Sequence, residues 1–111
     1  MNQKGDDTSS PANNICLKTY AVGRDLMVAA CDRELLGQTL SDGDVELVVL
    51  EDFYCSVYGD VELLTRHLER ATIANLVGER CVACGMQMGL IEEEKVLNIA
   101  NVPHAQFALM I

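Results

Sequence analysis

The polar residues best able to support binding or catalysis lie near predicted junctions between elements. Glu79 and Arg80 follow Gly78 at the start of a predicted helix. Glu79 suits the positive N-terminal end of that helix, and Arg80 can either hold a carboxylate or phosphate or tie down a loop. Asn75 lies in an apolar stretch, where an unpaired buried amide costs about 1–3 kcal/mol. We therefore expect this amide to pin a helix bend, to cap the helix that starts at Glu79, or to face a ligand.

A second polar pair follows a proline near the end of the chain. His104 comes directly after Pro103 in a predicted turn, and Gln106 is two residues further on. Both side chains should therefore lie on the same side of the last strand. Histidine can act as an acid or a base near neutral pH, and with glutamine it can recognise a ligand. The alternative is that His104 bonds a neighbouring backbone carbonyl.

Five cysteines provide the other reactive groups: Cys16, Cys31, Cys55, Cys81 and Cys84. The last two form a Cys-x-x-Cys pair, half of a zinc site, which needs about four ligands. Because these thiols lie one turn apart in an apolar helical segment, we expect them to pack in the core rather than bind metal or exchange disulfides. We predict no metal and no other cofactor. The odd cysteine count and the lack of an apolar signal segment indicate free thiols in the cytoplasm.

The composition fits one small acidic domain. The 111 residues are 50% hydrophobic, and 17 acidic residues against 8 basic ones give a net charge of -9. This charge repels phosphate backbones and anionic lipid, so we expect neither general nucleic-acid coating nor a membrane partner. A local cluster of side chains can still recognise a specific RNA element.

The elements that must position these residues form one domain after a polar leader. Residues 1–14 predict a disordered leader, and residues 15–111 a single domain. Alternating and short apolar runs predict strands at 15–22, 26–31, 45–50, 96–100 and 105–111. A single capped helical turn at 32–37, a turn at 41–44, an irregular loop at 51–59 and a turn at 101–104 connect these strands to one another and to the longer helices.

The helical part begins at Asp60, a predicted N-cap. Apolar residues at spacings of three and four then share one face: Val61, Leu64, Leu68 and Ala71. After Ala71 this stripe fails, so we predict that the helix bends there or is covered on all sides as far as Gly78. Another helix is predicted over residues 79–88. The order indicates a two-layer α+β sandwich, a mainly antiparallel sheet with helices packed on one face.

Three segments resemble a family of short archaeal proteins classed as a domain of unknown function. They are ACDRELLG at residues 30–37, ATIANLVGER at 71–80 and VPHAQ at 102–106. The resemblance covers about residues 16–110. It implies a compact α+β domain of the archaeal cytoplasm, associated with translation or a ribonucleoprotein. The family's polar motif residues match Asp32, Asn75, Glu79, Arg80, His104 and Gln106.

These six residues support two functions of different classes. The small size and the absence of a recognisable catalytic constellation favour a non-catalytic binding module with a protein or ribonucleoprotein partner. The sequence does not set the oligomeric state of the chain itself. The alternative is a small enzyme in which His104 pairs with Glu79 or Asp32 for acid–base chemistry and Arg80 holds an anionic substrate. The enzyme requires these side chains to converge in one pocket.

Overall fold

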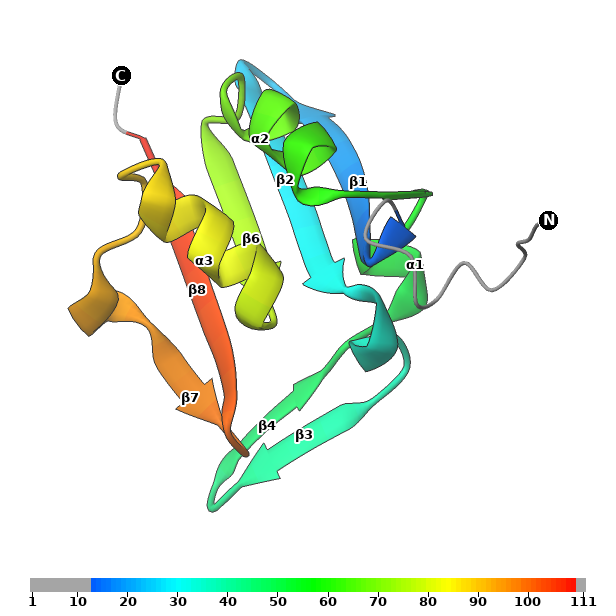
Figure 1. Cartoon of the computed structure of the whole chain (residues 1–111), viewed down its shortest axis with the longest axis vertical. Helices are drawn as coiled ribbons and strands as arrows, with labels where there is room; N and C mark the ends of the chain where they lie inside the picture. The colour runs from blue at the N-terminus through cyan, green and yellow to red at the C-terminus, as the bar shows by residue number, and fades with distance from the viewer. Residues whose placement is uncertain (1–12, 110–111) are drawn as a thin grey trace, which may run out of the picture.

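A six-stranded sheet runs through the computed structural model, which describes residues 13–109 (Figure 1). The strand order is β5-β1-β2-β6-β8-β7. The strands are β1 (Ile15–Val22), β2 (Asp25–Asp32), β5 (Val57–Gly59), β6 (Ile73–Val77), β7 (Leu97–Ile99) and β8 (Val102–Ala108). All neighbours are antiparallel except β2 and β6, which confirms the predicted α+β class. Most of the predicted leader, residues 1–12, lies outside the described residues.

Two helices, α2 (Val61–Leu68) and α3 (Glu79–Gln87), cover one face of the sheet (Figure 1). Asp60 caps α2 as predicted, because its carboxylate accepts the Leu63 N–H at 2.8 Å. Leu64 and Leu68 are buried against the sheet. Cys81 and Cys84 are buried in the same layer, so the core interpretation of this pair is confirmed. No helix within residues 13–109 has the length and apolar character needed to cross a membrane.

The opposite face of the sheet is covered in part by a short helix and a separate hairpin. Helix α1 (Glu51–Tyr54) packs there, and β3 (Thr39–Asp42) pairs with β4 (Val45–Val48). The 3-10 turn η3 (Arg33–Leu35) leads from β2 toward this hairpin, and η4 (Glu93–Lys95) precedes β7. A second apolar cluster fills this side: Cys16, Ala29, Cys31, Leu40, Val49, Tyr54, Val77 and Ile99.

The segment 73–77 corrects the predicted bent or fully covered helix. It forms β6, which pairs in parallel with β2 and antiparallel with β8. A central strand with both faces covered reads as a nearly continuous apolar run, which periodicity alone does not separate from a buried helix. The helical stripe fails after Ala71 because α2 ends at Leu68.

Smaller corrections concern the ends of elements. The third predicted strand stops at Val48, its partner β3 lies partly in the predicted turn at 41–44, and the predicted loop at 51–59 holds α1 and β5. The last strand begins at Val102 instead of Ala105, because the turn before it is shorter than expected. Two residues, Ala100 (φ 52°) and Asn101 (φ 69°), make this turn between β7 and β8.

Candidate functional site

The structure divides the six candidate residues between opposite faces of the sheet. Asp32 and Arg80 meet at the start of α3, on the side that carries the helices, and Glu79 lines the cleft beside them. His104 lies opposite Val77 in the β6–β8 register and therefore shares the other face with that residue. Asn75 is two residues from Val77 along β6, and Gln106 is two residues from His104 along β8, so both lie on the same face as His104.

The buried carboxylate of Asp32 caps helix α3. It accepts the backbone N–H of Arg80 and that of Cys81, each at 3.1 Å. The N-cap position itself is Gly78, which has no side chain to do this. Gly78 has a φ of 106°, and a Cβ there would overlap the Asp32 carboxylate. Glycine at this position therefore lets the carboxylate of a neighbouring strand reach the helix.

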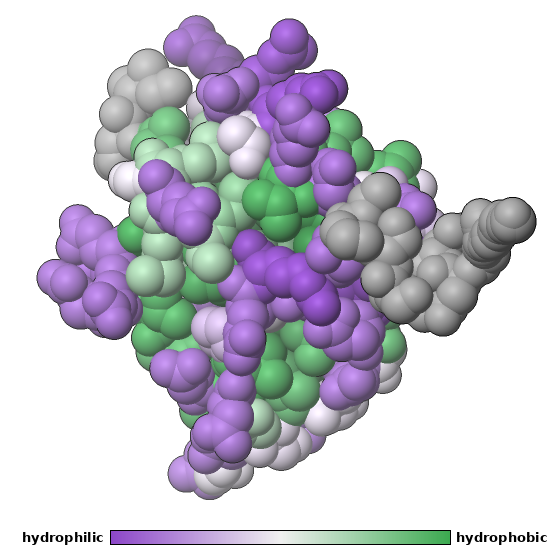
Figure 2. Space-filling view, in the orientation of Figure 1, coloured by the Kyte–Doolittle hydropathy of each residue, from purple (hydrophilic) through white to green (hydrophobic). Residues whose placement is uncertain are grey.

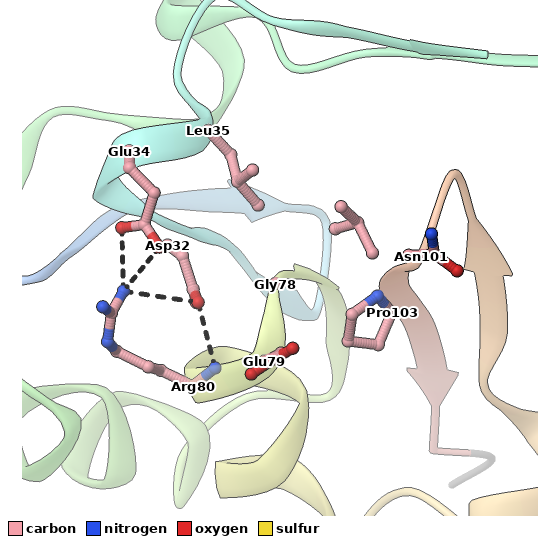
Figure 3. Close-up of a pocket in the computed structure, with 9 residues that line it drawn as sticks. Asp32, Glu34, Leu35, Gly78, Glu79, Arg80, Asn101 and Pro103 are labelled. Atoms are coloured by element: carbon pink, nitrogen blue, oxygen red, sulfur yellow. Dashed lines mark hydrogen bonds and ion pairs between the residues drawn. The ribbon is translucent and has the colours of Figure 1, made fainter.

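Arg80 ties η3 to α3 (Figure 3). Its Nη1 lies 2.8 and 3.0 Å from the two carboxylate oxygens of Glu34 and 3.4 Å from Oδ2 of Asp32. The hydrogen bond to Glu34 raises the pKa of Arg80. Burial raises the pKa of the Asp32 carboxyl, and its two backbone hydrogen bonds offset part of that rise. Of the two roles predicted for Arg80, the described contacts support the structural tie.

A cleft of about 250 Å³ lies beside this network. Figure 3 shows Glu34 and Arg80 on one side of it and Asn101 and Pro103 on the other. Its lining also includes the Asp32 and Glu79 carboxyl groups. Three carboxyl groups and one guanidinium that already contacts two of them make this cleft unsuited to an anionic ligand.

On the opposite face, four residues form what we term the Asn75 cluster: Tyr54, Asn75, His104 and Gln106. The Tyr54 hydroxyl donates to Oδ1 of Asn75 at 2.7 Å, and Nε2 of His104 lies 3.2 Å from the same oxygen. A carbonyl oxygen only accepts, so Nε2 of His104 carries the proton. Burial lowers the pKa of His104 and raises the pKa of Tyr54 to about 12. At pH 7 both side chains are therefore neutral.

The Asn75 cluster leaves three polar groups unused. The Asn75 carbonyl is occupied, but within residues 13–109 nothing bonds its amide nitrogen, Nδ1 of His104 or the exposed side chain of Gln106. Gln106 is the direct β8 partner of Asn75, so its Cβ lies within about 4.5–5.5 Å of that of Asn75. The cluster therefore presents two amides and an imidazole acceptor side by side, with no charge.

The structure changes the predicted setting of this group. His104 lies within β8, not in a turn, and its partner is the Asn75 side chain instead of a backbone carbonyl. The prediction that His104 and Gln106 share one side is confirmed. Sequence reasoning missed Tyr54, which lay in the predicted irregular loop. Its one available signal was general: the hydroxyl of a buried tyrosine needs a partner.

The acid–base arrangement considered as the alternative function is not assembled. His104 and Asp32 lie on opposite faces of the sheet, and the Asp32 carboxylate is occupied by the start of α3. Glu79 lies on the helical side as well, where it lines a second hollow with Val82 and Met86 of α3. In the part of the chain that the structure describes, no three His, Cys, Asp or Glu side chains are grouped to hold a metal ion.

Comparisons with known proteins agree with the predicted resemblance. A family described as "Protein of unknown function (DUF424)" matches residues 20–110. The fold is similar to the crystal structure of an uncharacterized conserved protein from Methanopyrus kandleri, with a TM-score of 0.74 and 22% sequence identity over 87% of this chain and 94% of that one. Comparison with curated proteins finds no match.

Proposed function

The chain belongs to the DUF424 family, whose description assigns no activity, and from the geometry we propose that it is a non-catalytic binding module that contacts its partner through the Asn75 cluster. One observation carries the proposal. The Asn75 carbonyl is held by both Tyr54 and His104, which fixes the amide and aims its unused nitrogen away from these partners. A side chain held in this way loses little conformational entropy on binding.

The chemistry of the cluster favours recognition over catalysis. Its side chains are neutral at pH 7, and no carboxylate within residues 13–109 hydrogen-bonds His104 to form an acid–base pair. Amides and an imidazole acceptor match the donors and acceptors of a peptide group or the edge of a base. Such binding depends little on charge, which fits a chain of net charge -9. The partner we propose is a protein or ribonucleoprotein associated with translation, in the cytoplasm.

The test is a pull-down of tagged protein from its native host, with and without ribonuclease, read for protein and RNA. Two substitutions remove unused polar groups of the Asn75 cluster and leave the hydrogen bonds to the Asn75 carbonyl in place. They are Gln106→Ala and His104→Gln, and the amide of the new glutamine can still donate to Asn75. The control is Gln87→Ala, which removes an exposed glutamine on α3, away from the Asn75 cluster. Melting temperatures identify variants that fail to fold.

We expect Gln106→Ala and His104→Gln to lose the same partner and Gln87→Ala to keep it. Ribonuclease then assigns the partner, because an RNA-bridged partner is lost on treatment and a direct protein partner is retained. Partners captured equally by folded cluster variants and wild type would refute the Asn75 cluster as the contact surface. The capture of no partner at all would refute the binding module.

A further inference from the structure

The outer edge of β1 is half open. Strand β5 pairs only with Ile15–Leu17, so within residues 13–109 the segment Lys18–Val22 has β2 on one side and no strand on the other. Thr19, Ala21 and Val22 are exposed, Val22 at 59%. An open edge presents a row of backbone N–H and C=O groups that can pair with another extended chain.

A hollow of about 440 Å³ adjoins this edge on the helical side. Thr19 and Leu26 line its sheet side, and Arg66, His67, Glu69 and Arg70 line its α2 side. Thr19 faces the helices because its β2 partner, Val28, belongs to the core beneath α2 and α3. A residue added opposite Thr19 on a new strand would share that face and so point toward the hollow.

The charge of this hollow is opposite to that of the molecule. Two arginines face one glutamate there, whereas the whole chain has a net charge of -9. Arg70 forms no ion pair with any residue between 13 and 109, and Arg66 has only an exposed partner, Glu62, at 3.6 Å. His67 uses Nδ1 on the Leu63 carbonyl, which leaves Nε2 as a further polar group.

The other face of the same edge carries a further cation. Lys18 alternates with Thr19 and lies on the side of α1, where its ammonium donates to the backbone carbonyl of Asp52 at 2.8 Å. In the described residues it forms no ion pair with a carboxylate. An added strand would therefore meet Lys18 on one of its faces and Arg66 and Arg70 on the other. The surface of α2 over this edge lies at the top of Figure 2, where hydrophilic side chains gather.

We propose that Lys18–Val22 is a docking edge for an extended acidic peptide segment of a partner, which adds to β1 as a strand and places a carboxylate in the hollow formed by Arg66, His67 and Arg70. This surface is separate from the Asn75 cluster, since β1 is two strands away from β6. A second copy of the chain fits less well. Two paired β1 edges would bring together two chains of charge -9 and would offer no acid opposite Thr19.

The probe is a fluorescein-labelled octapeptide of alternating glutamate and valine, with alternating lysine and valine as the matched control. A third peptide carries an N-methyl group on every backbone nitrogen and so loses the backbone donors needed for pairing in either direction. Anisotropy titrations on the whole chain give Kd, and amide exchange shows whether Lys18–Val22 gains protection. Arg66→Gln and Arg70→Gln test the hollow, and Lys95→Gln on η4 is the matched loss of a positive charge.

We expect the acidic peptide to bind at least tenfold more tightly than the basic one and to protect amides in Lys18–Val22. Arg70→Gln and Arg66→Gln should each weaken it at least threefold, and Lys95→Gln by less than twofold. The N-methylated peptide should lose binding. The proposal is overturned if the acidic peptide does not bind at millimolar concentration, if the arginine and lysine variants lose affinity equally, or if the protected edge reflects dimerisation of the chain. None of these outcomes depends on the Asn75 cluster, so the two proposals fail separately.

Discussion

Replacing Asp32 with alanine should destabilise the fold, because its carboxylate is the cap of α3. The side chain is 3% exposed and accepts two backbone N–H groups, those of Arg80 and Cys81. Gly78, at the N-cap position, offers no replacement. The variant therefore leaves two helix donors without a partner, one of them buried.

The size of the loss follows from these contacts. A buried donor left unpaired costs about 1–3 kcal/mol, and the loss of an ordinary hydrogen bond costs about 1 kcal/mol. The desolvation that raises the Asp32 pKa is relieved in the variant and offsets part of this cost. We expect a net loss of about 2–3 kcal/mol, a large share of the roughly 5–15 kcal/mol available to a small domain.

Urea unfolding at pH 7, followed by circular dichroism, measures this loss. Asp32→Asn keeps one accepting oxygen and should lose about half as much as Asp32→Ala. Glu34→Gln is the control for the exposed Arg80 contact, which should contribute at most about 1 kcal/mol. If Asp32→Ala lost less than about 1 kcal/mol, or no more than Glu34→Gln, the capping role assigned to Asp32 would be refuted.

Two further predictions concern β7–β8 and the Asn75 cluster. Ala100 has a φ of 52°, which costs a non-glycine residue about 1 kcal/mol or more, so Ala100→Gly should raise the free energy of unfolding by about 0.5–1 kcal/mol. The control Ala21→Gly, in the exposed end of β1, should lower the free energy of unfolding. If glycine lowered this free energy at both positions, the backbone strain assigned to Ala100 would be contradicted. Burial lowers the pKa of His104 in the folded state, so the unfolded chain takes up the proton first as the pH falls below about 6.5, and stability falls with it. Between pH 7.5 and 5.0 the free energy of unfolding should therefore decrease less in His104→Gln than in wild type. An equal decrease in both proteins would contradict the burial of this imidazole.

Local signals predicted the elements whose pattern does not depend on neighbours. The β1–β2 hairpin, the Asp60 cap and the helix after Gly78 follow from alternation, capping chemistry and a glycine stop, and all three are present. Strand β6 was missed because its neighbours decide its conformation. Both of its edges are paired and both of its faces contact the core, so its apolar residues carry no alternation. The sequence signal that did exist was the end of the helical stripe at Ala71.

The candidate site was predictable as a set of residues but not as a geometry, and the strand at 73–77 is the reason. With Asn75 on a helix, nothing relates it to His104 or Gln106, which are about thirty residues away. With Asn75 on β6, the register sets it directly opposite Gln106 and next to His104, and the two-residue period turns all three to one face. The same period turns Asp32 to the other face, where it meets Arg80. The assignment of one segment as strand or helix therefore decides whether the six residues form one site or two.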